Sequence, residues 1–219
     1  MTWVVIVAAV ALFAAPLATA MPAAKTVAEI VQTLADQTQV PNLVTSVILH
    51  ARLFDTISEV VVFTLAALGV RHLLAVEPAQ RQIRVLDDPP SVVLCELGAT
   101  ISGLIAVELA LRGHLTPGGG FAAGVAGGTG VGLLLISGGA NRAERLYRRY
   151  RADLLEKLAV LGFIVVAFLL LIGVNLPPGV AGTLLSGGWI PLLNVLVAIK
   201  VTLGSWAMVQ LFVRYRGVL

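Results

Sequence analysis

Five ionisable side chains stand out inside long apolar stretches of this sequence: Asp55, Glu59, Glu96, Glu108 and Lys200. Asp55 and Glu59 are four residues apart and would share one face of a helix. Charged groups inside a membrane are costly and normally face protein, water or a partner charge. Such residues therefore mark either ion pathways or structural ion pairs, provided that the surrounding segments are membrane spans.

The composition is that of a polytopic membrane protein. Of the 219 residues, 58% are hydrophobic and 12% are charged, and the mean hydropathy is +0.95. Soluble domains carry about 25% charged residues. The net charge of +3 comes from clustered basic residues, which indicates membrane topology rather than nucleic-acid binding. The single cysteine, Cys95, excludes a disulfide framework and a cysteine-rich metal site within the chain. We expect no cofactor and no catalytic extramembrane domain.

Six segments have about the 20 apolar residues that a spanning helix needs. They are residues 2–20, 53–75, 91–112, 119–139, 155–174 and 190–213. The first ends in small residues, as a cleaved signal peptide would, but it lacks the positively charged start of one. The sequence therefore predicts an all-α fold with six transmembrane helices, or five if the first is removed.

Arginines fix the expected orientation. Arg71, Arg81 and Arg84 lie around the link between the second and third spans, further arginines crowd residues 142–151, and two follow the last span. Residues 113–118 and 175–189 contain no lysine or arginine. Basic loops stay in the cytoplasm. This alternation predicts that both termini are cytoplasmic and that the two uncharged links face outward.

The segments between the spans suggest a division of the chain. Residues 21–42 have Val27, Ile30, Val31 and Leu34 at helical spacing, which predicts an interfacial helix. Asn42 is a candidate cap for a continuous helix over residues 43–72. Residues 76–90 form a polar linker, so we expect one unit over residues 1–75 and another over residues 91–219.

The charged residues differ in how readily a structural role explains them. Lys200 lies near the middle of the last span, where a lysine needs a carboxylate, loss of its proton or a water-filled path. An ion pair that locks this span to a neighbour is the structural alternative. Glu108 has Arg112 four residues away as a local partner, and Glu96 either reaches the headgroups or titrates within the membrane. Glu59 has no basic residue within one turn, and a contact with Lys200 stays open.

The motif GHLTPGGGF precedes a glycine-rich span. Gly120, Gly124, Gly128 and Gly132 recur every four residues, which lets two helices approach closely. A phosphate-binding loop would need a soluble strand–loop–helix unit, which this chain lacks. No second histidine or carboxylate cluster lies near His114, so we expect a rigid turn and no metal site there. The residues assigned to the turn and to helix packing are Arg112, Gly113, His114, Pro117, Gly118, Gly119, Gly120, Phe121, Gly124 and Gly128.

These motifs resemble a known family. The run LRGHLTPGGGFAAGVAGGTGVGLLLISGG is similar to the MrpB (MnhB) subunit of multisubunit Na+/H+ antiporters, whose signature is an RGH-x-x-PGGGF turn followed by a small-residue helix. The last span, LNVLVAIKVTLGSWAMVQLF, also resembles the closing helix of that family, including its lysine. The resemblance covers about residues 91–213.

A second resemblance lies upstream. The run VTSVILHARLFDTISEVVVFTLAALGV is similar to the C-terminal part of MrpA, the large antiporter subunit, and to the MbhE subunit of membrane-bound hydrogenases. Arg52, Phe54, Asp55, Thr56 and Glu59 match the shared pattern, while Leu53 and Ser58 replace two of its glycines. The resemblance implies a fusion of an MbhE-like unit with an MrpB-like unit.

These resemblances imply a function that composition alone does not supply. The chain would be a subunit of an Mrp-type Na+(K+)/H+ antiporter in a prokaryotic cell membrane, with other subunits, Na+ or K+, protons and the bilayer as partners. The same module in a redox-driven, complex I-like assembly and a purely structural scaffold are the alternatives. By resemblance, Glu59 would bind an ion or proton, including a transient Na+, with Asp55 at its entrance. Lys200 would be the charge partner of a carboxylate.

Overall fold

The computed structural model of the chain describes residues 26–78, 86 and 88–216. Contacts divide the chain into two units, Met1–Thr33 and Leu34–Leu219. Helix α2 (Val27–Thr38) runs across this division, and its start, in the first unit, is a capping box. In this box the Thr26 hydroxyl accepts the Glu29 N–H, and the Glu29 carboxylate accepts the Thr26 N–H, both at 3.3 Å. The predicted span over residues 2–20 lies outside the described residues.

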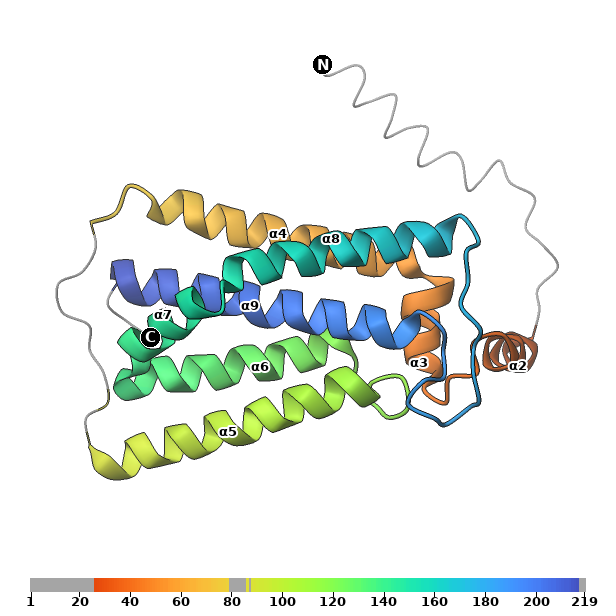
Figure 1. Ribbon diagram of the computed structural model, residues 1–219, viewed down its shortest axis with the longest axis horizontal. Helices are drawn as coiled ribbons and strands as arrows, with labels where there is room; N and C mark the ends of the chain where they lie inside the picture. Colours follow the sequence, from red (N-terminus) through yellow and green to blue (C-terminus); the bar gives the residue numbers. More distant parts are fainter. Residues whose placement is uncertain (1–25, 79–85, 87, 217–219) are drawn as a thin grey trace, which may run out of the picture. The chain divides into compact units, whose positions relative to one another are not determined.

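The other five predicted spans are all present, so the all-α membrane fold is confirmed (Figure 1). They are α4 (Leu53–Leu74), α5 (Pro89–Arg112), α6 (Gly120–Leu134) with its continuation η2 (Leu135–Gly139), α8 (Ala152–Leu171) and α9 (Ile190–Arg216). Two short helices, α3 (Leu43–Ser46) and η1 (Val47–Ala51), precede α4. A third, α7 (Ala140–Arg149), lies between η2 and α8. The described residues contain no strand.

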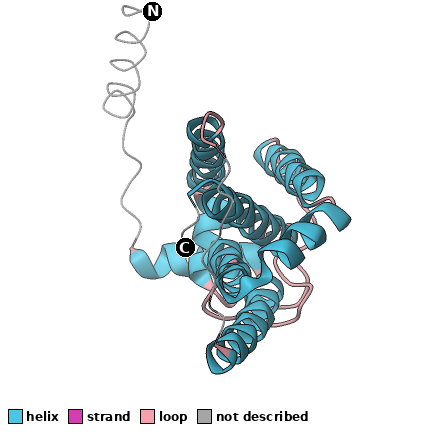
Figure 2. Cartoon of the chain, turned by 90° about the vertical axis from the view of Figure 1, so that its left-hand side faces the viewer, coloured by secondary structure: helices cyan, strands magenta, loops and turns pink. Residues whose placement is uncertain are grey.

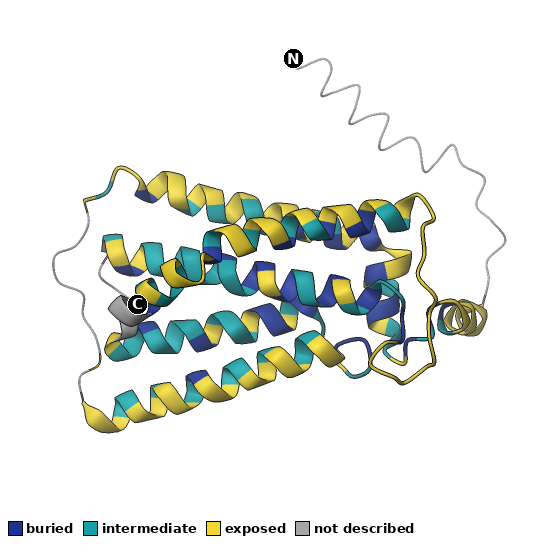
Figure 3. Cartoon of the chain, in the orientation of Figure 1, coloured by how far each residue is buried: buried dark blue, intermediate teal, exposed yellow. Residues whose placement is uncertain are grey.

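Within the unit Leu34–Leu219, α9 is the central helix. It contacts α4, α5, α6 and α8, and the end-on view shows the helices gathered in a bundle (Figure 2). Over an apolar stretch of 18 residues, 39% of the residues of α9 are buried inside the protein, compared with only 6% of those of α5. The outer faces of α4, α5 and α8 are largely exposed and apolar (Figure 3), as lipid or neighbouring subunits require.

The predicted continuous helix over residues 43–72 is wrong, because it breaks at Arg52. The predicted cap is present: the Asn42 Oδ1 accepts the N–H groups of Val44 and Thr45 at 3.2 and 3.4 Å. The chain then widens into η1, and the Arg52 N–H donates to the carbonyl of Val47 at 2.7 Å, five residues earlier. No glycine or proline marks this break in the sequence.

The predicted rigid turn after α5 is held by side chains from α3 and its cap. The Asn42 Nδ2 donates to the carbonyls of Gly113 and Thr116, both at 2.8 Å. The Thr45 hydroxyl also donates to the Gly113 carbonyl at 2.8 Å. A Cβ at Gly113 would lie 2.6 Å from the Leu109 carbonyl oxygen, so only glycine fits there. The turn therefore joins the chain before α4 to the chain between α5 and α6.

His114, in the same turn, is fully buried. Neither ring nitrogen makes a hydrogen bond of normal geometry within the described part of the chain. Burial lowers the pKa of the His114 imidazole, and the nearby backbones of Thr183 and Leu184 offset only part of this shift. The imidazole is therefore neutral at neutral pH, as a structural role in the turn requires.

The glycine stripe of α6 faces α9, as its spacing predicts, but only over part of its length. A Cβ at Gly120 would lie 2.7 Å from Val197, one at Gly128 would lie 2.8 Å from Ser205, and one at Gly124 would overlap Val201. A Cβ at Gly132 meets nothing within 4 Å, so this glycine does not belong to the contact. The two backbones approach along the first half of α6, where the Thr202 hydroxyl donates to the Gly124 carbonyl at 3.4 Å.

We expect Gly124→Ala to destabilise the protein by about 1–3 kcal/mol, the usual cost of overpacking a core. Gly132→Ala is the matched control, because it gains the same helix propensity but meets open space. Thermal unfolding of the detergent-solubilised protein compares the two. Equal melting temperatures would contradict the close α6–α9 contact.

Candidate functional site

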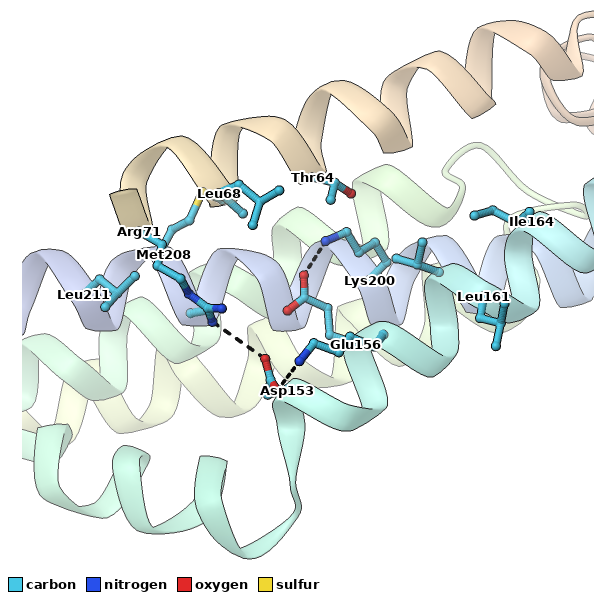
Figure 4. A pocket seen from close by; sticks show the side chains of 14 residues that line it. Thr64, Leu68, Arg71, Asp153, Glu156, Leu161, Ile164, Lys200, Met208 and Leu211 are labelled. Carbon is cyan, nitrogen blue, oxygen red and sulfur yellow. Dashed lines mark hydrogen bonds and ion pairs between the residues drawn. The ribbon is translucent and has the colours of Figure 1, made fainter. Parts of the chain in front are cut away.

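Lys200 on α9 forms an ion pair with Glu156 on α8 (Figure 4). The side chains are 3% and 15% exposed, so both charges are largely removed from the surface. An ion pair in a medium of low dielectric constant is strong, but each partner alone would be very costly to bury. The partner of Lys200 is therefore a carboxylate on the neighbouring span, one of the alternatives predicted from the sequence.

Gly204 and Phe63 are the two neighbours that enclose this ion pair. Gly204 lies one turn after Lys200, and a Cβ there would be 3.2 Å from the Glu156 Oε1 and 3.5 Å from the Lys200 Nζ. The Lys200 Nζ also lies 5.5 Å from the ring centroid of Phe63 on α4, within the range of a cation–π contact. The pair is thus enclosed by α4, α8 and α9.

A cavity of ≈ 300 Å³, here named the Lys200 cavity, reaches this pair between α4, α8 and α9. Its other charged residues are Arg71, Asp153 and Lys157. Asp153 accepts from Lys157 at 2.6 Å and lies 3.7 Å from Arg71, and Figure 4 shows Arg71 reaching from α4 toward α8. These three side chains are about half exposed, so charged groups form the open end and the ion pair lies deeper.

Glu59 is exposed and lines a different, open cavity of ≈ 510 Å³, here named the Glu59 cavity. The walls come from the chain before α4, from α4 itself, from the glycines of the signature turn (Gly118–Gly120) and from α9. No ion pair or hydrogen bond of the Glu59 carboxylate occurs among the residues that the structure describes. Lys200 is not among the residues that line this cavity, so the open question of a Glu59–Lys200 contact is answered in favour of Glu156.

Asn194 is a polar residue of the Glu59 cavity that was not predicted from the sequence. Its side chain is 2% exposed, and its Oδ1 accepts the Gly120 N–H at 3.0 Å. The Nδ2 is buried and has no hydrogen-bond partner within the described residues. A buried amide donor normally has a partner. Asn194 therefore fastens the signature turn to α9 and offers a donor next to the Glu59 cavity.

The remaining predicted charges lie outside both cavities. Asp55 pairs with Arg52 at 2.5 Å, and both side chains are more than half exposed. Glu108 pairs with Arg112 at 2.8 Å on the surface of α5, as the local alternative expected. Glu96 is exposed on α5. Within the described ranges, no group of three or more His, Cys, Asp or Glu residues is arranged to hold a metal ion.

Glu156 was not predicted from the sequence as the partner of Lys200. It lies near the start of its span and beside Lys157, so it resembles one of many charges at a helix end. The actual partner of Lys157 is Asp153, which leaves Glu156 to α9. Gly204, one turn beyond Lys200, was the available signal that another side chain approaches there.

We expect Glu156→Gln to destabilise the protein by about 3–5 kcal/mol, because Lys200 would then be a buried charge without its partner. The double variant Glu156→Gln with Lys200→Met removes both charges and should regain most of that loss. Glu144→Gln breaks an exposed pair with Arg148 and should cost less than about 1 kcal/mol. A double variant as unstable in thermal unfolding as Glu156→Gln alone would contradict this account.

The chain resembles a curated relative and two solved structures, and it matches one protein family. A probable K(+)/H(+) antiporter A/B subunit of Rhizobium meliloti (strain 1021) is 33% identical over 132 residues, which are 49% of this chain and 13% of that protein. The chain thus aligns with only a small part of that relative. A chain of the membrane-bound sulfane sulfur reductase, an archaeal respiratory membrane complex, matches with a TM-score of 0.70 and 22% identity, covering 97% of both chains.

A chain of the Mrp complex from Dietzia sp. DQ12-45-1b matches with a TM-score of 0.65 and 20% identity, over 98% of this chain and 25% of that one. At these identities the two structures establish the fold. Residues 90–207 match the family described as "Domain related to MnhB subunit of Na+/H+ antiporter". This match covers more than half of the chain, contains the signature turn and Lys200, and confirms the resemblance inferred from the motifs. The protein therefore belongs to the family of the domain related to the MnhB subunit of Na+/H+ antiporters.

Proposed function

We propose that this protein is a membrane subunit of an Mrp-type Na+(K+)/H+ antiporter and that it contributes directly to the cation and proton path. The observation that carries the proposal is the position of Glu59. Its carboxylate lies without a partner, among the described residues, in a cavity whose wall is the family's signature turn, Gly118–Gly120. Ionisable residues within membrane spans mark ion pathways when no structural pair accounts for them.

A single carboxylate in such a cavity suits exchange chemistry. It binds a proton or an alkali cation, and each displaces the other because both neutralise the same negative charge. The hydroxyl groups of Thr45 and Thr56 line the same cavity and supply further oxygen atoms. Asp55 is held by Arg52 at the surface of the same helix face, where the pair tunes the field at the entrance rather than binding the ion.

Lys200 has a separate role in this proposal. Its ammonium is matched by Glu156, so it does not compete with a cation for Glu59. The pair holds a carboxylate and an ammonium group together within the membrane, where either group alone would be costly to bury. We assign Glu59 to ion binding and the Lys200–Glu156 pair to holding a polar path open beside it.

The chain organisation supports a fused subunit. The family match begins at residue 90, at the end of the polar linker of residues 76–90, and α4 with its FDT motif lies before it. A chain of the sulfane sulfur reductase complex shares the fold over 97% of its length. We assign residues 1–75 to an MbhE-like or MrpA-like unit and residues 91–219 to the MrpB-like unit.

That structural match also favours a second candidate function, the same ion-translocating module within a redox-driven respiratory complex. In either case the chain is a transporter component, and we propose that it has no catalytic chemistry of its own. The subunits that copurify with it decide between the two candidates. Subunits that bind iron–sulfur clusters would favour the redox-driven complex, and a complex made only of antiporter subunits would favour the first.

The orientation is a further part of the proposal. We expect a reporter fused after Arg216 to lie in the cytoplasm and one inserted at Pro178, in the uncharged link between α8 and α9, to lie outside. The reason is that arginines gather at the end of the unit where α7 and the end of α9 lie. Paired alkaline phosphatase and fluorescent protein reporters measure the two sides. The opposite result would reverse the predicted topology.

We expect Glu59→Gln to lower cation-dependent proton exchange by about tenfold or more, because a charge-assisted ligand contributes about 1.5–3 kcal/mol to binding. Exchange is measured in everted membrane vesicles that contain the whole complex, as the collapse of a pH gradient when Na+ or K+ is added. Glu144→Gln, which changes an acid on the surface of α7, is the matched control. Full exchange in an assembled Glu59→Gln complex would leave a structural scaffold as the remaining function.

A further inference from the structure

The Glu59 cavity and the Lys200 cavity both have walls from α4 and α9. On α4, Glu59 and Ala66 line the first cavity, while Thr64, Ala67 and Arg71 line the second, so the two linings interleave along the helix and occupy different faces of it. On α9, Asn194 and Val197 line the first, while Lys200, Met208 and Leu211 line the second. Both helices begin at the end of the unit where the signature turn lies (Figure 1), and along α9 the Glu59 cavity is the nearer of the two to that end.

Phe63 lies at the junction between the two cavities. It lines the Glu59 cavity but not the Lys200 cavity, and its ring packs against the buried core. The Lys200 Nζ lies 5.5 Å from the centroid of this ring. A Cβ at Gly204 would lie 2.6 Å from the Phe63 Cε1, so the ring also sits directly against the backbone of α9.

Resting on the proposed role of Glu59, we infer that Phe63 is the barrier between two water-accessible half-paths, one ending at Glu59 and the other at the Lys200–Glu156 pair. An exchanger must not leave a continuous water path across the membrane, because ions and protons would then leak without coupling. An aromatic ring that closes the gap between two polar cavities supplies such a block, and apolar constrictions of this kind stop ions by excluding water.

The chemistry of the two cavities fits this division. The Glu59 cavity holds a carboxylate with hydroxyl groups and the Asn194 amide nearby. The Lys200 cavity opens through Arg71, Asp153 and Lys157, whose charges draw water inward toward the ion pair (Figure 4). Phe63 lines the Glu59 cavity, and its ring lies 5.5 Å from the Lys200 Nζ in the wall of the other cavity, so this ring borders both.

Neighbouring alanines on α4 provide the test, since Ala66 lines the first cavity and Ala67 the second. In a Cys95→Ser background, Ala66→Cys and Ala67→Cys are introduced one at a time into the assembled complex. Each is treated with a charged, membrane-impermeant thiol reagent added to one side of oriented membrane vesicles. We expect labelling of the two positions from opposite sides of the membrane. Labelling of both from the same side, or of neither, would overturn the inference.

Phe63→Ala is then added to each cysteine variant. We expect labelling from the formerly closed side to become about tenfold faster, the change that corresponds to about 1.4 kcal/mol of barrier. We also expect a proton leak without added Na+ or K+. Phe168→Ala, which removes an exposed aromatic ring from α8, is the matched control and should change neither. Unchanged labelling and no leak in an assembled Phe63→Ala complex would refute the barrier.

These outcomes separate the inference from the proposed function. Loss of exchange in Glu59→Gln with same-side labelling of both cysteines would keep the ion-binding role and remove the barrier. Full exchange in Glu59→Gln would refute the ion-binding role itself, whichever side labels each cysteine.

Discussion

An ammonium group inside a membrane needs a negative partner, and this requirement fixes how the central helix of the protein meets its neighbours. Lys200 reaches Glu156 only if α8 and α9 keep a set rotation and a set depth relative to one another. The absence of a side chain at Gly204 lets Glu156 and Phe63 approach the same turn of α9. One charge pair therefore positions three spans, because α4 joins the cluster through the Phe63 ring.

The contact between α6 and α9 fixes the other side of the central helix. In lipid, no hydrophobic effect drives two apolar helices together, so close backbone approach and hydrogen bonds must do so. Gly120, Gly124 and Gly128 permit the approach, and Asn194 binds the first N–H of α6. The signature turn is thus held from two directions, by α9 and by Asn42. This double attachment explains why the turn can form a firm wall of the Glu59 cavity.

The features that could be predicted from the sequence are those that depend on the residues of one helix alone. Span positions follow from hydropathy, and the glycine contact of α6 follows from its four-residue spacing. The pairing of Lys200 was predictable in kind but not in partner, because the depth of Glu156 depends on how α8 is placed beside α9. The break at Arg52 also escaped prediction, because it arises from a π-helical widening with no glycine or proline to mark it. Gly132 follows the four-residue pattern, yet a Cβ there would meet nothing within 4 Å, although Val131 and Leu135 beside it still pack in one cluster with Val213 of α9.

Both cavities depend on α4, which precedes the matched family domain, and on α9, which belongs to it. Neither part of the chain alone could enclose Glu59 or the Lys200–Glu156 pair. Two separate subunits would have to meet and keep this register in the bilayer, whereas a covalent link turns their association into an intramolecular step with a high effective concentration. Because α4 and α9 belong to one chain, Phe63 on α4 meets Lys200 on α9 in such an intramolecular step.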